Sequence, residues 1–125
     1  MKYTATIYSN APSKSNSYEI IKLKNKKGGY YSSLKKSEAV KMFETFVQSC
    51  LSNDFKAAKI DKPFKLELDV TFRNKASDLD GCTKSILDSL QYSGAITNDS
   101  LCYELNLKKK VNREDPKIIL TLTIL

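Results

Sequence analysis

The sequence predicts an α+β fold: a single small domain, residues 1–125, in which a mixed or antiparallel sheet of about four strands packs against two main helices. Residues 64–72 alternate between apolar and polar side chains, as strands with one buried face do, and residues 118–124 form a strand with one apolar face and a second face that is also fairly apolar. Between residues 37 and 59, apolar side chains instead recur every three or four positions, which indicates an amphipathic helix. The length of 125 residues suits one domain with one modest core.

The first part of the chain predicts extended segments joined by turns. Residues 2–8 alternate between polar and apolar side chains and form the first predicted strand. Residues 9–16 have the composition of a turn, and residues 17–24 form a second extended segment. Residues 25–33 are expected to form a loop that pivots at a glycine pair.

The two predicted helices have recognisable ends. The helix at 37–59 would begin at Ser37, whose side chain can cap the first turn. Its apolar face is expected to consist of Ala39, Phe43, Phe46, Val47, Cys50 and Leu51. After the strand at 64–72 and a polar loop, Asp80 is expected to cap a second helix that stops near Gly94. The remaining elements are a turn at 97–100, a strand at 101–107, a loop at 111–116 and the last strand at 118–124.

The composition excludes several kinds of chemistry. The chain has no histidine, and its three cysteines lack the C-x-x-C spacing of zinc sites. A zinc site is therefore not expected, and Ser–His or Cys–His nucleophilic catalysis is excluded because the base is missing. Cys50, Cys82 and Cys102 are interpreted as small core residues of a protein in a reducing compartment.

The charge balance favours a polyanionic partner. Lys and Arg outnumber Asp and Glu by 21 to 14, and nucleic acid is the default partner of a domain with a net charge of +7. A merely soluble basic domain would carry the same charge. The apolar runs are too short to span a membrane, and the first ten residues lack the apolar stretch of a signal peptide. The protein is therefore expected in the cytoplasm.

Three acidic residues are candidates for a metal site. Asp78 and Asp80 are one residue apart, so their side chains can point the same way in an extended or pre-helical turn. Two such carboxylates repel each other unless a proton or a cation neutralises them, and hard oxygen ligands select Mg²⁺ or Mn²⁺. Asp99 follows one helix and one turn later, and the order of elements can return it to the same corner. Capping of the helix by Asp80 would explain the pair without a metal.

Basic residues surround these acids in the sequence. Lys84 lies four residues after Asp80, and Asp88 lies four residues after Lys84, so all three share one helical face. A row of salt bridges on a solvated face would explain Asp88 without a catalytic role. Arg73 and Lys75 follow one predicted strand, and three lysines at 108–110 end another. Acids inside a basic field are typical of metal nucleases, in which cations hold the phosphate backbone and carboxylates hold the metal.

The order of motifs from Pro63 to Leu125 is distinctive. The strand PFKLELDVTF is followed by DLD, a lysine four residues later, LDSL, a glycine and an acidic turn that ends at Asp99. In this order and spacing the run resembles the RusA family of Holliday-junction resolvases, which are small phage and prophage endodeoxyribonucleases. The segment APSKSNSY at 11–18 is similar to the family's P-S-x-x-N-x-Y turn, and GGYYSS before a long helix is also similar. The resemblance covers nearly the whole chain and is most specific at 78–99.

The resemblance implies a RusA-like fold and an Mg²⁺-dependent endodeoxyribonuclease that cuts four-way junctions by paired nicks, with Mn²⁺ as a substitute metal. Carried over residue by residue, it places the catalytic and metal-binding acids at Asp78, Asp80 and Asp99, and the essential lysine at Lys84. The expected DNA contacts are Arg73, Lys75 and Lys84. The family also implies a homodimer on branched DNA, no small-molecule cofactor, and the host cytoplasm as location if the protein is phage-encoded.

Three positions depart from the family pattern. Gly81 stands where the family usually has Asn, Asn98 replaces the first Asp of an acidic pair, and Ser77 stands where a basic residue is common. Lys75 is the expected substitute for that basic residue. The departures concern turnover rate and sequence preference more than the class of reaction. They keep two alternatives open: a non-catalytic or weakly active basic protein that binds nucleic acid, and a metal nuclease that acts on flaps or other branched DNA.

Two further surfaces are predicted. Residues 25–36 combine lysines and glycines with Tyr30 and Tyr31, so this loop is a candidate for stacking on bases at an opened junction. Tyrosines that cover the edge of the core would give the same pattern. The helix at 37–59 and the apolar last strand are candidates for a dimer interface, although burial in the monomer's own core explains both as well.

Overall fold

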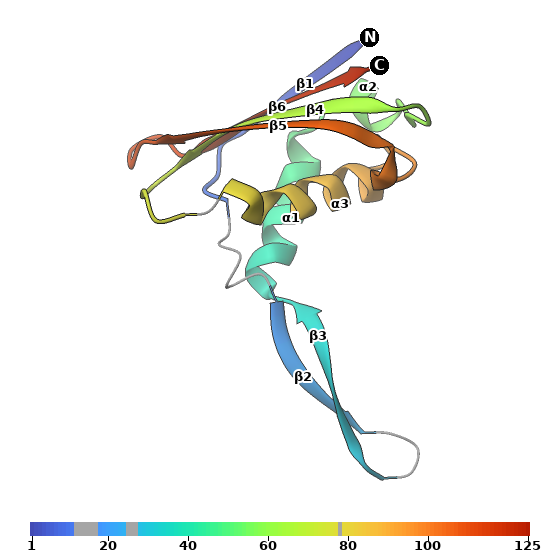
Figure 1. Ribbon diagram of the computed structural model, residues 1–125, viewed down its shortest axis with the longest axis vertical. Helices are drawn as coiled ribbons and strands as arrows, with labels where there is room; N and C mark the ends of the chain where they lie inside the picture. The colour runs from blue at the N-terminus through green and yellow to red at the C-terminus, as the bar shows by residue number, and fades with distance from the viewer. Residues whose placement is uncertain (12–17, 25–27, 78) are drawn as a thin grey trace.

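The computed structural model describes residues 1–11, 18–24, 28–77 and 79–125, and at 18–24, 30–36 and 80 it describes the backbone alone. It confirms the predicted α+β class: a four-stranded mixed sheet in the order β1–β6–β4–β5, with the two longer helices on one face (Figure 1). The strands of this sheet are β1 (Lys2–Ile7), β4 (Phe64–Phe72), β5 (Cys102–Val111) and β6 (Lys117–Ile124). β6 pairs antiparallel with both β1 and β4, whereas β4 and β5 are parallel.

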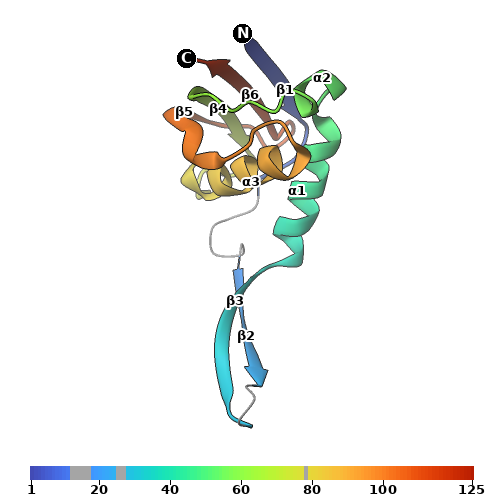
Figure 2. The same ribbon diagram turned by 90° about the vertical axis from the view of Figure 1, so that its right-hand side faces the viewer.

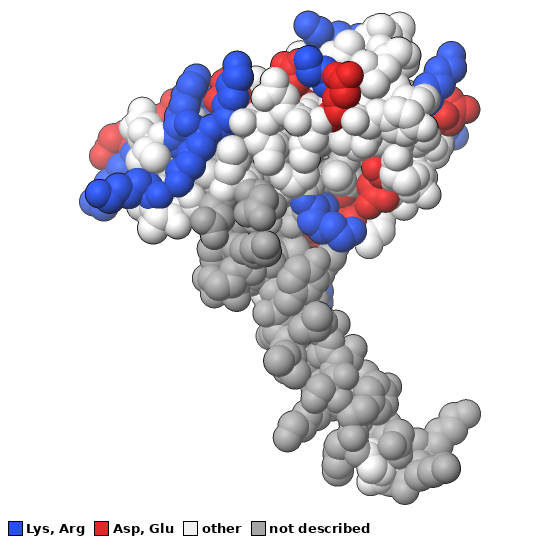
Figure 3. All heavy atoms as spheres, in the orientation of Figure 1, with Lys and Arg blue, Asp and Glu red and all other residues white. Residues whose placement is uncertain are grey.

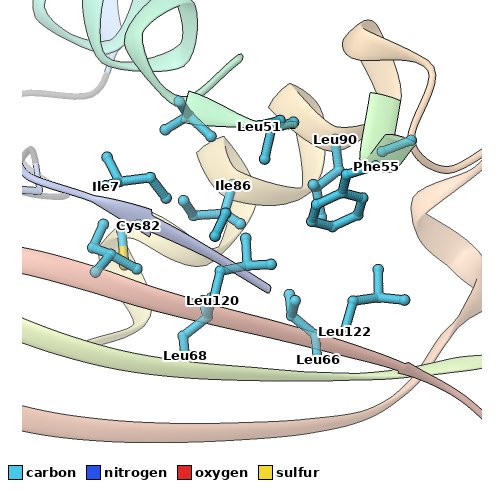
Figure 4. Close-up of a cluster of buried hydrophobic side chains, with 14 of the residues drawn as sticks. Ile7, Leu51, Phe55, Leu66, Leu68, Cys82, Ile86, Leu90, Leu120 and Leu122 are labelled. Atoms are coloured by element: carbon cyan, nitrogen blue, oxygen red, sulfur yellow. The ribbon is translucent and has the colours of Figure 1, made fainter. Parts of the chain in front are cut away.

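The strand β4 lies inside the sheet and shows the predicted alternation. Its residues at 64, 66, 68, 70 and 72 are at most 1% exposed, while Lys65, Glu67 and Asp69 are half-buried on the other face. Figure 4 shows Leu66 and Leu68 of β4 and Leu120 and Leu122 of β6 below Ile86 and Leu90, which come from the helix α3 (Thr83–Ser93). This apolar contact fixes α3 against the sheet, so the opposite face of the helix is turned outward.

The predicted helix at 37–59 is wrong in extent, because two helices form instead of one. They are α1 (Glu38–Cys50) and α2 (Asn53–Lys56). Leu51 has an extended backbone, and the side chain of Ser52 then accepts a hydrogen bond from the backbone N–H of Phe55, which starts the second helix. Leu51 and Phe55 both reach the core, at 4% and 0% exposed, so the apolar pattern continues across the break and resembles one long helix.

The start of α1 is as predicted, but the set of residues predicted for its apolar face is partly wrong. The side chain of Ser37 caps the helix by accepting a hydrogen bond from the backbone N–H of Val40. Val40 is buried, whereas Ala39 is exposed and Phe46 is 42% exposed.

In the described part of the chain, no helix has the length and apolar character that crossing a membrane requires.

The unit β4–α3–β5 positions the candidate site. The short 3₁₀ turn η2 (Leu79–Cys82) precedes α3, and a second one, η3 (Asp99–Leu101), precedes β5. Asp80 therefore lies inside η2, and the prediction that it caps the helix is wrong: the cap position is Cys82, which makes no side-chain cap hydrogen bond. Gly94 ends α3 as predicted, with φ at 92°, a conformation that glycine adopts without strain.

β2 (Tyr18–Lys24) and β3 (Tyr30–Lys36) form a separate antiparallel hairpin that extends away from the sheet (Figures 1 and 2). The second extended segment is thus confirmed, but the predicted loop at 25–33 is too long, because β3 already begins at Tyr30. Its lysines, serines and tyrosines do not alternate by polarity, so the period that reveals a strand is missing. The side chains of Tyr30 and Tyr31, like most of the predicted turn at 9–16, lie outside the described residues, and stacking by the tyrosines stays a prediction.

The strand β5 lies at an edge of the sheet and is longer than the predicted strand at 101–107. Tyr103 is 69% and Leu105 47% exposed, since the edge position leaves one side of the strand uncovered. The additional residues, 108–111, pair with the end of β4. Three of them are consecutive lysines, so the apolar alternation that predicts a strand stops before them. The pairing brings these lysines beside the chain that leaves β4.

Candidate active site

A basic surface, here called the basic end, forms where β4 and β5 terminate together. Phe72 and Val111 are opposite each other in the parallel ladder, so the loop after β4 begins beside the last residues of β5. The basic end consists of Arg73, Lys75, Lys108, Lys109 and Lys110. Figure 3 shows Lys and Arg side chains gathered at this end of the molecule. Cations clustered in this way attract the phosphate backbone of nucleic acids.

Lys109 connects β5 to the loop after β4. Its Nζ donates hydrogen bonds to the backbone carbonyl oxygens of Lys75, at 2.8 Å, and Ser77, at 2.5 Å. The same ammonium lies 5.6 Å from the centre of the Phe72 ring, within the range of a cation–π contact. In the sequence Lys109 was one of three equivalent lysines, and the structure distinguishes it from its neighbours.

The outward face of α3 carries Lys84 and Asp88. Nζ of Lys84 lies 3.1 Å from Oδ1 of Asp88, which confirms the salt bridge predicted from their spacing, and 3.7 Å from Oδ2 of Asp99. The turn η3 therefore returns Asp99 to the face of α3 that carries Lys84. One ammonium group bridges two carboxylates that are eleven residues apart in the chain.

The side chain of Asp88 is more buried than a residue in a salt bridge on a solvated face would be. Its side chain is 12% exposed, compared with 38% for Asp99 and 62% for Lys84. A carboxylate that is largely removed from water needs a partner, and Lys84 supplies one. Asp88 thus belongs to the candidate site, although its spacing from Lys84 alone is equally typical of an ordinary helical salt bridge.

The turn η3 holds the backbone of Asp99 in place. The backbone N–H of Asp99 donates to Oε1 of Gln91 at 3.1 Å, and the side chain of Asn98 accepts from the backbone N–H of Ser100 at 2.9 Å. Asn98, one of the departures from the family pattern, is therefore the cap of η3. An asparagine oxygen serves as a cap as well as an aspartate oxygen does, so this departure preserves the turn that presents Asp99.

The other two predicted acids are not placed by the structure. Asp78 and the side chain of Asp80 lie outside the described residues, so their convergence with Asp99 stays a prediction. Among the side chains that are described, no three acidic or cysteine side chains gather closely enough to hold a metal ion. The donors that are placed, Asp88 and Asp99, offer carboxylate oxygens, and the chain has no histidine. This donor set fits a hard cation such as Mg²⁺ and not zinc.

Cys102 lies next to the candidate site, at the start of β5. Burial raises the pKa of its thiol, a hydrogen bond with the backbone of Leu66 lowers it, and the negative charge of Asp99 raises it. The net effect is a raised pKa, which keeps the thiol neutral at neutral pH. Because a thiolate is the form that binds metals and attacks electrophiles, Cys102 does not compete with the oxygen donors.

Comparison with known proteins agrees with the resemblance found in the sequence. A family model described as endodeoxyribonuclease RusA matches residues 12–123, which is nearly the whole chain. A search of curated proteins finds no match. The matched range contains β4, α3, η3 and β5, and with them every position predicted for the candidate site.

Proposed function

The chain belongs to the RusA family of endodeoxyribonucleases, and from this membership we propose that it cuts four-way DNA junctions by Mg²⁺-dependent hydrolysis of one phosphodiester bond in each of two strands. The family implies the nuclease activity of a Holliday-junction resolvase and branched DNA as its substrate. The metal, the paired cuts and the residue roles are our proposal. The observation that carries it is the ammonium of Lys84 between the carboxylates of Asp88 and Asp99, on the outward face of α3.

The proposed metal ligands are Asp78, Asp80 and Asp99. When bound, a divalent ion supplies an acidified water as the nucleophile and positive charge that offsets the charge developing on the phosphate. Carboxylate oxygens suit Mg²⁺, with Mn²⁺ as a substitute. Asp99 fits this role because η3 holds its backbone while its side chain is 38% exposed and accessible to an ion.

Lys84 is proposed to contact the scissile phosphate. Its ammonium is held at one place by two carboxylates, and the side chain is 62% exposed, so a phosphate oxygen can reach it. A positive charge fixed beforehand at the point where negative charge develops stabilises the transition state more than a mobile one. Asp88 would keep the ammonium in that position.

Arg73 and Lys75 are proposed to hold the phosphate backbone of the junction arms. Both belong to the basic end, and both are exposed. Contacts of this kind carry no sequence information, but they give binding that weakens as the salt concentration rises.

A homodimer is part of the proposal, because two subunits related by a two-fold axis would present two equivalent sites to the two strands that are cut. Met42 and Phe46 of α1 support the first of the two predicted interfaces. They are 71% and 42% exposed, so burial in the monomer's own core does not account for them.

The proposed reaction is tested by incubating the protein with a synthetic four-way junction and with a linear duplex of the same sequence. We expect nicks in the junction with Mg²⁺, none in the linear duplex, and loss of all cleavage when EDTA removes the metal. Junction binding without cleavage in Mg²⁺ or Mn²⁺ would favour the non-catalytic alternative. Equal cleavage of flaps and junctions would favour a nuclease for other branched DNA.

A further inference from the structure

We propose that Lys109 is a positioning residue that fixes the loop leading into Asp78 and Asp80 and thereby sets the affinity of the site for Mg²⁺. The catalytic consequence rests on the proposed function, whereas the attachment of the loop does not. The inference assigns a separate task to one lysine of the basic end, which otherwise has only the general role of attracting DNA.

The attachment involves three points on the chain that leaves β4. Nζ of Lys109 donates to the carbonyl oxygens of Lys75 and Ser77 and lies over the ring of Phe72. Hydrogen bonds from a charged donor are stronger than those between neutral groups. One ammonium therefore joins the last residue of β4 to both ends of the segment 75–77.

The register of the sheet explains why Lys109 has this role and its neighbours do not. Lys109 is opposite Val70 of β4, whose side chain is buried on the helix side, and side chains of paired residues share a face. Lys108 and Lys110 point to the other face, where Nζ of Lys110 lies 3.3 Å from Oδ2 of Asp69. The middle lysine of the three thus faces the side of the sheet on which α3 and the candidate site lie.

Among the described residues, three other hydrogen bonds involve this loop. Oδ1 of Asn74 accepts from the backbone N–H of Ala76 and from the hydroxyl of Ser77, and the backbone N–H of Arg73 donates to Oδ1 of Asn10. These bonds shape the loop and join its first residue to Asn10, three residues after the end of β1. Lys109 joins its last residues to β5, and the Ser77 carbonyl that it binds belongs to the peptide bond that leads into Asp78.

A group that orients the chain next to a metal ligand affects how tightly the metal is bound. In metalloproteins, removing such a group typically weakens metal affinity or activity by about 10- to 100-fold. The ammonium of Lys109 satisfies two carbonyl groups of the loop, so it is placed to orient the chain at Asp78 more than to meet a phosphate. The two roles make different predictions for metal dependence and for DNA affinity.

The test compares Lys109→Met, which removes the ammonium but keeps the stem, with Lys108→Met, which removes the same charge from the opposite face. Three quantities are measured: amide hydrogen exchange at residues 74–80 in the protein alone, the Mg²⁺ concentration that gives half-maximal junction cleavage, and junction affinity in Ca²⁺. We expect Lys109→Met to speed the exchange and to raise the Mg²⁺ midpoint about 10- to 100-fold. Lys108→Met should change neither, and Lys109→Arg should recover part of the loss.

Two results for the methionine variants would contradict the inference. An unchanged Mg²⁺ midpoint with junction affinity reduced equally in both methionine variants would make Lys109 a phosphate contact. A lower melting temperature with unchanged exchange and an unchanged Mg²⁺ midpoint would make its role merely structural. If the wild-type protein cuts no junction in Mg²⁺ the proposed function fails, but the exchange comparison still decides: faster exchange in Lys109→Met alone supports the attachment, and equal exchange overturns it.

Discussion

Replacing Asp99 by asparagine is expected to reduce Mg²⁺-dependent junction cleavage by about 10²- to 10³-fold, the loss that follows when one group stabilising transition-state charge is removed. Asparagine keeps the shape of the side chain and one oxygen, but it has no charge with which to hold a divalent ion. The backbone of η3 should stay in place, because its hydrogen bonds come from Gln91 and Asn98 and not from the Asp99 carboxylate. The measurement is the single-turnover rate of cleavage at saturating protein.

Junction affinity separates a lost metal ligand from a damaged protein. Removing a negative charge from a surface that binds DNA reduces repulsion, so Asp99→Asn should bind the junction as tightly as the wild type or more tightly. Asp54→Asn is the matched control, since it makes the same chemical change at an exposed residue of α2 and should cleave at the wild-type rate. Cleavage by Asp99→Asn at the wild-type rate would show that Asp99 is not a metal ligand.

The substitution Lys84→Met is expected to lower the cleavage rate by about 10²-fold, because the ammonium proposed to meet the scissile phosphate is lost while the apolar stem remains. The change also removes the cation that lies between Asp88 and Asp99. Lys84→Arg keeps the charge but replaces a compact ammonium with a planar guanidinium, so only part of the rate should return. Single-turnover cleavage at saturating Mg²⁺ measures both effects.

The control for this variant is Lys65→Met on the opposite face of the sheet. Nζ of Lys65 lies 3.0 Å from Oε1 of Glu67, so this variant also removes an ion pair. Exposed ion pairs stabilise a fold by at most about 1 kcal/mol, so both variants should stay folded with similar melting temperatures. Equal cleavage by Lys84→Met and Lys65→Met would remove Lys84 from the proposed mechanism.

The parts of the fold that could be predicted are those in which one period dominates the sequence. The sequence of β4 alternates between apolar and polar residues over nine positions, and its apolar face is buried. Ser37, as a cap residue, predicts where α1 begins. The break after Leu51 leaves no mark in the apolar pattern because both helices face one core, and β3 gives no strand pattern because its polarity does not alternate. Aspartate is common at helix caps and so predicts a cap at Asp80, whereas η2 moves the start of α3 to Thr83.

In the candidate site, contacts between residues close in sequence can be predicted, whereas contacts between distant segments depend on the fold. The salt bridge from Lys84 to Asp88 follows from helical spacing alone. The approach of Asp99 to Lys84 depends on how η3 and β5 return beside α3, which the order of elements allows and the family resemblance implies. Lys109 could not be distinguished within a run of three lysines, because its role depends on the register between β5 and β4. Extending the alternation of β5 to residue 111 would have shown that Lys109 and its neighbours face opposite sides.

The proposed convergence of three acids on one ion is tested most directly by a crystal structure of the protein with Mn²⁺ bound in place of Mg²⁺. The proposal predicts one or two ions at the outward face of α3, with oxygens of Asp78, Asp80 and Asp99 at coordination distances of roughly 2.1 Å. An ion held by Asp78 and Asp80 while the Asp99 carboxylate points away, beyond the reach of a shared ion, would contradict it.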